Sequence, residues 1–240
     1  MKMQINKLFL ALVAAASSTV ALAQHPEAGT FSVIPRIGLS IANLPGNDVY
    51  VGGVNAVSSP RYRTSFMGGV DLDYQFMRNL SVTLGAYYAQ QGCNYKNNSV
   101  ESSSGNGTIE GTGYSDWSTQ LHYINVPLML NAYIAPGVAL KAGVQMGFAM
   151  SGKMKYTTAD YTVDKSGEVK ASMPEEHEYN LNNTMKKVCF AIPVGFSYEF
   201  SNVIIDARYN IGLTSFQKIN DYNGTKNRVF TVSAGYRFAL

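Results

Sequence analysis

The sequence predicts an all-β chain that forms an eight-stranded antiparallel up-and-down transmembrane β-barrel, with short turns at one end and long loops at the other. Three observations predict this fold class. Eight segments alternate large apolar side chains with small or polar ones at a period of two residues. The connections between these segments alternate between short and long. Charged residues make up 15% of the chain, against about 25% in an ordinary soluble domain.

Residues 1–23 have the pattern of a cleavable signal peptide. Two lysines precede an apolar run at 8–16, and residues 21–23, Ala-Leu-Ala, form a small-x-small cleavage site. The run is shorter than the about 20 apolar residues that a membrane-spanning helix needs. No cysteine follows the site, so we do not expect a lipid anchor. We expect an exported chain whose residues 24–240 form one barrel domain.

The first three strands are predicted at 31–41, 66–76 and 80–89, where the alternation is regular. Their apolar faces are Phe31, Val33, Ile37, Leu39 and Ile41; Phe66, Val70, Leu72, Tyr74 and Phe76; and Leu80, Val82, Leu84, Ala86 and Tyr88. The fourth strand, at about 119–133, is less regular because Leu121 and Tyr123 lie on the face opposite to Ile124 and Leu128. Pro127 cannot donate a ladder hydrogen bond, so we predict a bulge there.

The last four strands are predicted at 140–150, 188–200, 203–213 and 230–240, again with regular alternation. Tight turns at 78–79, 135–137 and 201–202 join strands 2–3, 4–5 and 6–7, whereas polar loops near 43–64, 92–118, 152–186 and 215–226 join the others. Outer-membrane barrels have this asymmetry, with short periplasmic turns and long extracellular loops. An even number of strands places both ends of the chain on the periplasmic side.

The apolar face of the predicted strands is expected to contact lipid. A soluble barrel of the lipocalin type would have the opposite arrangement, with a polar exterior. The apolar face carries almost no charge, His122 and Arg228 being the exceptions, and the other face is mostly Gly, Ala, Ser, Thr and Asn. Small side chains fit the narrow lumen of an eight-stranded barrel. These observations favour localisation in an outer membrane.

Eight charged residues on the lumenal face lie within about six residues of the short turns or of the C-terminus. They are Arg36, Asp71, Asp73, Lys141, Glu199, Asp206, Arg208 and Arg237. Buried charges persist when they are paired and hydrogen-bonded. Four acids and four bases therefore predict a neutral salt-bridge network with a structural role, which closes the barrel and argues against a wide pore.

Cys93 and Cys189 are predicted on strands 3 and 6, nearly opposite each other. The two Cα atoms of a disulfide lie within about 7 Å of each other, so the topology favours two unpaired thiols. Export to an oxidising compartment keeps a disulfide between them as the alternative.

The predicted strands resemble those of the PorT family, porin-like outer-membrane β-barrel proteins of Gram-negative bacteria. The resemblance covers essentially the whole mature chain. It depends on the segments 35–40 (PRIGLS), 69–76 (GVDLDYQF), 123–128 (YINVPL), 192–195 (IPVG) and 235–238 (GYRF). The resemblance implies the fold and the outer-membrane location. Some relatives are linked to protein secretion, but no residue here carries that role over.

Two histidines, His122 and His177, are candidates for chemical sites. His122 lies near Asp116 and Ser118 at the outer end of strand 4, where a membrane hydrolase or acyltransferase could place such groups, but a polar rim residue is favoured. His177, among glutamates at 175–178, could belong to a metal site, but a solvated acidic loop is favoured. We therefore predict no enzyme, no cofactor and no bound metal.

The leading functional hypothesis is a barrel that anchors surface loops for adhesion or interaction, or that supports envelope integrity. Membrane lipid, the outer-membrane assembly machinery and envelope or secretion proteins are the expected partners. The mature chain has a net charge of +1, so nucleic acid is not expected. The alternative is a small-molecule channel or a binder of lipid or another hydrophobic ligand in the upper lumen. That part of the lumen is lined by Met67, Tyr87, Gln91, Gln145, Ala149 and Asn210.

Overall fold

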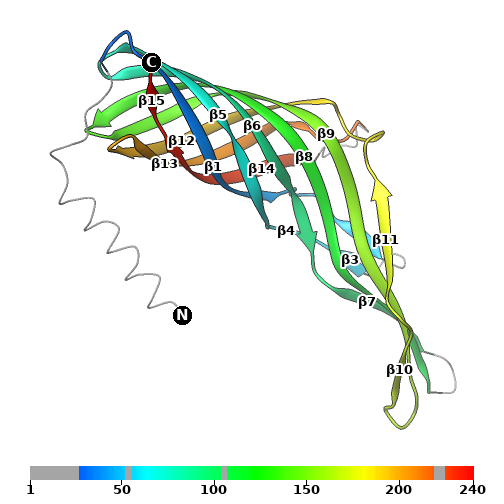
Figure 1. The fold of residues 1–240 in the computed structure, drawn as a ribbon. Coiled ribbons are helices and arrows are strands. Elements are labelled where there is room, and N and C mark those ends of the chain that lie inside the picture. Colours follow the sequence, from blue (N-terminus) through cyan, green and yellow to red (C-terminus); the bar gives the residue numbers. More distant parts are fainter. Residues whose placement is uncertain (1–26, 52–55, 104–106, 219–224) are drawn as a thin grey trace.

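The computed structural model describes residues 27–51, 56–103, 107–218 and 225–240, so the predicted signal peptide lies outside the described residues. Within this part of the chain, eight long antiparallel strands form a closed ring (Figure 1). They are β1 (Phe31–Asn43), β5 (Arg63–Met77), β6 (Leu80–Tyr95), β8 (Ile109–Ala135), β9 (Val138–Val163), β12 (Val188–Phe200), β13 (Val203–Ser215) and β14 (Lys226–Tyr236). Each strand pairs with the next along the chain, and β14 returns to β1, where Arg36 faces Gly235. The predicted barrel is confirmed.

Seven shorter strands complete the described fold. They are β2 (Val49–Val51), β3 (Ala56–Ser58), β4 (Pro60–Arg61), β7 (Asn98–Ser103), β10 (Val169–Ala171), β11 (Glu175–Asn180) and β15 (Phe238–Ala239). No helix in the described residues is long and apolar enough to cross a membrane.

The two faces of the barrel wall follow the alternation in the sequence. Large apolar side chains point outward, and Leu39, Leu72 and Phe196 are each more than half exposed. The inward positions are small or polar and buried, among them Ser40 and Asn131. Because the outer surface of the barrel is apolar, lipid rather than water is the solvent that matches it.

The fourth strand differs from its prediction in two ways. Its register is unchanged across Pro127, because Leu84 faces Leu128 and Tyr87 faces Asn125, so the bulge predicted at the proline is absent there. The register against β9 shifts instead between His122 and Tyr123. Leu121 and Tyr123 lie on the lumenal face with the same parity as Asn125, and both are buried. The apparent break in alternation therefore marks the point where the lumen becomes apolar, beside a register shift of β8 against β9.

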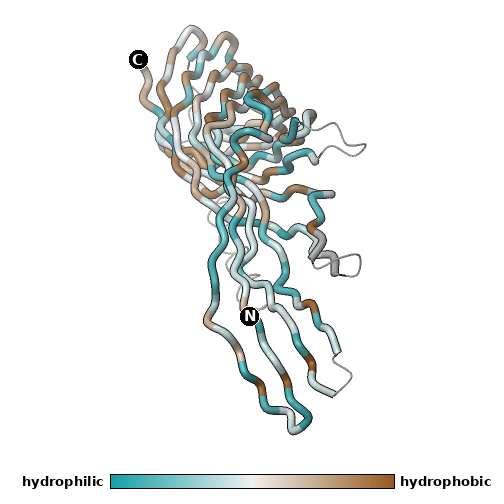
Figure 2. Tube along the Cα trace, turned by 90° about the vertical axis from the view of Figure 1, so that its right-hand side faces the viewer, coloured by the Kyte–Doolittle hydropathy of each residue, from teal (hydrophilic) through white to brown (hydrophobic). Residues whose placement is uncertain are grey.

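Two of the four predicted long loops are wrong, because much of 92–118 and 152–186 is extended β-sheet. β8 and β9 have 27 and 26 residues, whereas a membrane-spanning strand needs about 9–11. At about 3.3 Å per residue, each is about 85–90 Å long. Their outer halves pair with each other, and β7, β10 and β11 pair onto them. Together they form a sheet, here called the arm (residues 98–103, 107–118 and 151–180), that projects beyond the ring (Figure 1) and is more hydrophilic than the barrel (Figure 2).

A β-bulge at Asp116 and a tight turn at Asp164 shape the arm. Asp116 has a positive φ of 52° in the bulge where the β8–β9 register shifts, between Ser115 and Ser118. At the distal turn the Asp164 carboxylate accepts hydrogen bonds from Ser166 and from the backbone of Glu168. These bonds hold the pKa of Asp164 below its usual value. Asp and Gly at such positions are typical of tight turns rather than of flexible loops.

Candidate functional site

A first ion network around Arg237 occupies the short-turn end of the lumen. The Arg237 guanidinium donates twice to Glu199, from Nε to Oε1 at 2.7 Å and from Nη2 to Oε2 at 3.0 Å. Its Nη1 donates to Oδ1 of Asp73 at 2.9 Å. The hydroxyls of Ser81 and Thr83 donate to the other Asp73 oxygen, each at 2.8 Å. The network therefore joins side chains from several strands around the ring.

A second ion network lies further along the lumen, toward the arm. Arg36 Nε donates to Asp71 at 2.7 Å, and Arg208 Nε donates to Asp206 at 2.6 Å. Lys141 donates to the same Asp206 carboxylate at 2.7 Å. Arg208 Nη2 also reaches Asp71 at 3.3 Å, so the two carboxylates share their cations. Such sharing satisfies buried charges that an isolated pair would leave partly unpaired.

All eight charged residues predicted for the lumen are brought together, but in two groups. None is more than 8% exposed. The group around Arg237 contains one base and two acids, and the group around Asp206 contains three bases and two acids, so the groups carry −1 and +1. The alternation of faces revealed which charges turn inward. It does not predict which of these residues form each of the two groups, because the grouping depends on the stagger between neighbouring strands.

The lumen contains little free volume beside these networks. Two cavities of about 30 and 20 Å³ lie between the charged residues and the arm end of the barrel. Their linings include Gln91, Gln145 and Asn210 of the predicted ligand site. A water molecule needs about 10–15 Å³ on this measure, so the two cavities hold about one to three waters each. This volume counts against a lumenal ligand.

An apolar plug fills the arm end of the lumen. Its buried members are Leu44, Cys93, Tyr95, Trp117, Leu121, Tyr123, Met185 and Phe216. They come from four barrel strands or the segments next to them and from the connection after β11. Gly152 leaves the space that Met185 and Leu121 occupy, because a Cβ at this position would overlap both. The plug was not predicted, although the inward parity of Leu121 and Tyr123 was its signal in the sequence.

The arm has two faces with different chemistry. Its inner face continues the lumenal wall, and its outer face continues the outer wall of the barrel. On the inner face an aromatic row crosses the sheet: Trp117 lies 4.9 Å from Tyr156 between ring centroids, and Tyr156 lies 4.9 Å from His177 and 5.8 Å from Tyr179. Tyr114 contacts both Trp117 and Tyr156. The hydrogen bond to Tyr179, together with burial, raises the pKa of Tyr156 to about 12.

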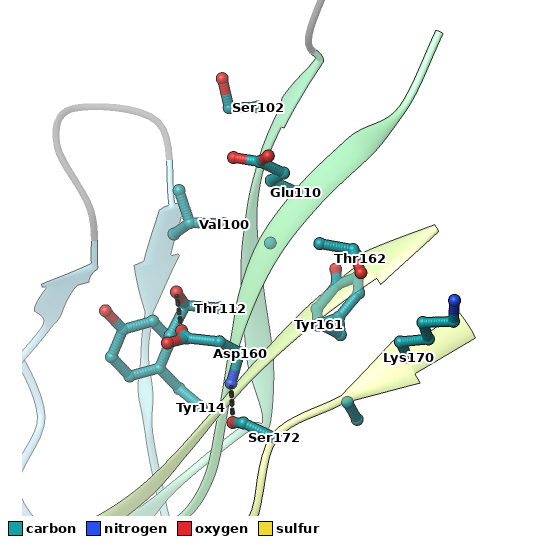
Figure 3. A pocket seen from close by; sticks show the side chains of 12 residues that line it. Val100, Ser102, Glu110, Thr112, Tyr114, Asp160, Tyr161, Thr162, Lys170 and Ser172 are labelled. Carbon is teal, nitrogen blue, oxygen red and sulfur yellow. Dashed lines mark hydrogen bonds between the residues drawn. The ribbon is translucent and has the colours of Figure 1, made fainter. Parts of the chain in front are cut away.

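A hollow of about 740 Å³ lies beside this row on the inner face (Figure 3). β7 contributes Val100 and Ser102 to its lining, and the segment from β10 to Ser172 contributes the opposite side. On its floor the Thr112 hydroxyl donates to Asp160 at 2.6 Å across β8 and β9. The sequence does not predict the hollow, because 92–118 and 152–186 have the polar pattern of loops.

The outer face of the arm carries exposed ion pairs. The Glu178 carboxylate lies 2.5 Å from the Lys153 ammonium and 2.7 Å from the Lys155 ammonium. Hydrogen bonds from these two lysines lower the pKa of Glu178 to about 2. All three side chains are 42–46% exposed, so water and salt screen the pairs.

His122 is not positioned as a catalytic base. Its Nδ1 lies 2.6 Å from the Tyr88 hydroxyl on the outer wall of the barrel. Ser118 instead accepts a hydrogen bond from Gln120, and no bond joins His122 to Ser118 or to Asp116 among the described residues. A nucleophile and its base must lie within hydrogen-bond reach, and this pair does not.

His177 lies on β11 rather than in a loop. Its Nε2 is 2.9 Å from the Thr158 hydroxyl, and its ring packs on Tyr156. No group of three or more potential ligand side chains occurs in the described part of the chain. The arrangement uses His177 as a packing residue of the aromatic row.

Both cysteines are free thiols. Cys93 is buried in the plug, and Cys189 lies within 3.9 Å of the Tyr123 hydroxyl. This outcome agrees with the favoured expectation from the topology.

Comparison with known families decides the class of this barrel. The model of the outer membrane protein beta-barrel domain family matches residues 22–218, most of the chain. The chain belongs to this family. As an outer membrane protein beta-barrel domain, it resides in the outer membrane, and lipid surrounds its apolar wall. No curated protein matches it in sequence.

Solved structures with a similar course of the chain are also outer-membrane or designed barrels. Ail, the attachment invasion locus protein of Yersinia pestis, is 17% identical, with 88% of this chain and 99% of that chain covered and a TM-score of 0.42. Neisserial surface protein A is 12% identical, with coverages of 87% and 97% and a TM-score of 0.38. A de novo designed transmembrane β-barrel is 13% identical, with coverages of 89% and 99% and a TM-score of 0.33. At TM-scores below 0.5, these similarities carry no functional weight.

In this outer-membrane barrel, charge is divided by zone outside the lumen. The outer rim, here the described segments 43–51, 56–63, 94–97, 186–187, 214–218 and 225–228, has eight bases and one acid, a net charge of +7. The arm has four lysines and nine acids, a net charge of −5. The arm is therefore acidic and the rim next to it is basic. The two charges nearly cancel in the net charge of the whole chain.

Proposed function

We propose that this protein is a non-enzymatic anchor that holds a rigid β-arm outside the cell for interaction with other molecules, while its barrel stays closed to diffusion. The observation that carries the proposal is the contrast within one chain between a filled lumen and a long ordered sheet beyond it. Two charged layers and an apolar plug leave cavities for only a few waters. The arm adds about a dozen residues to each of β8 and β9, more than the membrane requires.

The proposal includes the route to the membrane. Residues 1–23 direct export and are removed, the outer-membrane assembly machinery inserts residues 24–240, and a role with envelope or secretion partners follows the resemblance to PorT-family proteins. Mass spectrometry of the mature protein should give an N-terminus at Gln24. A mature chain that retains residues 1–23 would contradict this route.

Conductance tests the closed lumen. The purified full-length protein, reconstituted in planar bilayers, should give no stepwise ion current, because ions would have to pass both the plug and the charged layers. Stable single-channel steps would overturn the closed-lumen proposal.

An arm-shortened variant tests whether the arm is a presented surface. Asn98 faces Tyr114, and Tyr156 faces His177, so residues 99–113 and 157–176 can each be replaced by an Asn-Gly turn between paired positions. The variant should still insert, and its folded form should unfold at the same denaturant concentration as the full-length barrel. Failure to insert would show that the arm serves folding rather than presentation.

A further inference from the structure

We propose that the hollow and the aromatic row on the inner face of the arm form a binding site for an uncharged, hydroxyl-rich sugar chain. The inference rests on the proposed function, since it names the class of ligand that the arm would hold. The hollow and the row share Tyr114, which lines the first and contacts Trp117 and Tyr156 in the second. One ligand could therefore contact both.

The lining of the hollow matches sugar hydroxyls. Six residues of its lining carry a hydroxyl. The Tyr161 hydroxyl donates to Glu101 on the opposite face, and the other five, Ser102, Thr112, Tyr114, Thr162 and Ser172, stand against two carboxylates and one lysine. A hydroxyl both donates and accepts hydrogen bonds, as each sugar hydroxyl does, and a carboxylate accepts from two neighbouring hydroxyls. Thr112 donates to Oδ1 of Asp160, which orients the carboxylate and leaves the lone pairs of Oδ2 for a ligand. Figure 3 shows Thr112, Asp160 and Tyr114 together at one end of the hollow.

The aromatic row supplies the apolar part of such a site. The faces of sugar rings present C–H groups, which pack on the negative face of an aromatic ring. Tyr179 is 52% exposed and lies nearly parallel to Tyr156, at an interplanar angle of 12°. Trp117, at the end of the row next to the plug, has a buried indole N–H with no acceptor among the described residues.

Size and charge restrict the ligand further. A hollow of about 740 Å³ is within the range of about 300–1,000 Å³ that ligand sites have, and it is open, so a chain can continue from it along the row. The arm's net charge of −5 repels sulfated or phosphorylated polymers. A cationic peptide would meet Lys170 in the wall and would leave most of the hydroxyls without a matching partner. An uncharged glycan meets neither obstacle.

Tryptophan fluorescence offers a direct measurement, because Trp117 is the chain's one tryptophan. The full-length protein in tryptophan-free lipid vesicles is titrated with dextran and mannan as neutral probes and with dextran sulfate and poly-L-lysine as charged probes. Co-sedimentation of each polymer with the vesicles gives an independent readout. At least one neutral polymer should bind and change the Trp117 emission, whereas dextran sulfate should do neither.

Matched variants locate the site. Asp160→Asn and Tyr179→Ala should each weaken neutral-polymer binding about tenfold, the effect of losing one charge-assisted hydrogen bond or one well-packed aromatic contact. Glu101→Gln is the control, because Glu101 accepts from Tyr161 on the opposite face of the same sheet, and it should leave the affinity unchanged.

Three outcomes would overturn the glycan proposal: no neutral polymer binds, poly-L-lysine binds in their place, or Glu101→Gln weakens binding as much as Asp160→Asn. None of them would contradict the closed barrel with its presented arm. Conductance and the arm-shortened variant decide that separately.

Discussion

The lumen and the arm both contain ion pairs of basic and acidic side chains, but the pairs have different roles in the two regions. Arg237 and Glu199 in the lumen lie 2.7 Å apart, and Lys155 and Glu178 on the arm lie 2.7 Å apart. The lumenal pair is no more than 10% exposed, whereas the arm pair is 42–46% exposed. Distance alone therefore says little about what an ion pair contributes. A buried pair fixes the fold because either charge left alone is costly, whereas an exposed pair adjusts the surface.

Removing one lumenal charge should have the largest effect. Arg237→Ala leaves Glu199 and Asp73 buried without their cation, so we expect the free energy of unfolding to fall by about 3–5 kcal/mol. Denaturant titration of the protein in lipid bilayers measures this change.

Lys170→Ala is the matched control for the lumenal variant. Lys170 is 74% exposed and lies 3.9 Å from Glu168, so its loss should change stability by less than about 0.5 kcal/mol. If both variants lowered the free energy of unfolding equally, buried lumenal charges would contribute no more to stability than exposed charges of the arm.

Loss of the central ring of the arm should have a smaller and local effect. Tyr156→Ala removes ring contacts with Tyr114, Trp117, His177 and Tyr179, which we expect to destabilise the arm by about 1–3 kcal/mol. Amide hydrogen exchange should increase in β10, β11 and the arm portions of β8 and β9, and stay unchanged in the barrel strands that do not enter the arm. Increased exchange in β1 or β14 would instead show that arm and barrel unfold as one unit.

The contrast between lumen and arm also marks what the sequence could predict. Eight strands, their outward face and the eight lumenal charges follow from a period of two, because a one-residue slip would turn every side chain to the wrong face. The sequence predicts loops where the arm lies, because the arm strands are polar on both faces, as at Thr112-Gly113 and Thr157-Thr158, and no alternation distinguishes them from coil. Pairing partners distant in the sequence, such as Glu110 with Thr162, define that sheet, and local patterns do not contain them.

The smallest expected effect is that of acidification, which should weaken the exposed ion pairs of the arm. The pKa of Glu178 is lowered to about 2 by hydrogen bonds from Lys153 and Lys155, against about 4.3–4.5 in an unfolded chain. A carboxylate with a lowered pKa contributes stability above its unfolded pKa and loses it as the pH falls through the folded pKa. The β9–β11 pairing should therefore keep this contribution down to about pH 4.5 and lose it between there and about pH 2. Carboxyl-carbon NMR of Glu178 measures the titration directly. Because salt screens exposed charges, the midpoint should move toward its ordinary value as ionic strength rises. A midpoint that starts near 4.3 at low salt would mean that the two lysines do not hold Glu178, and Glu178→Gln would then leave the arm unchanged at every pH.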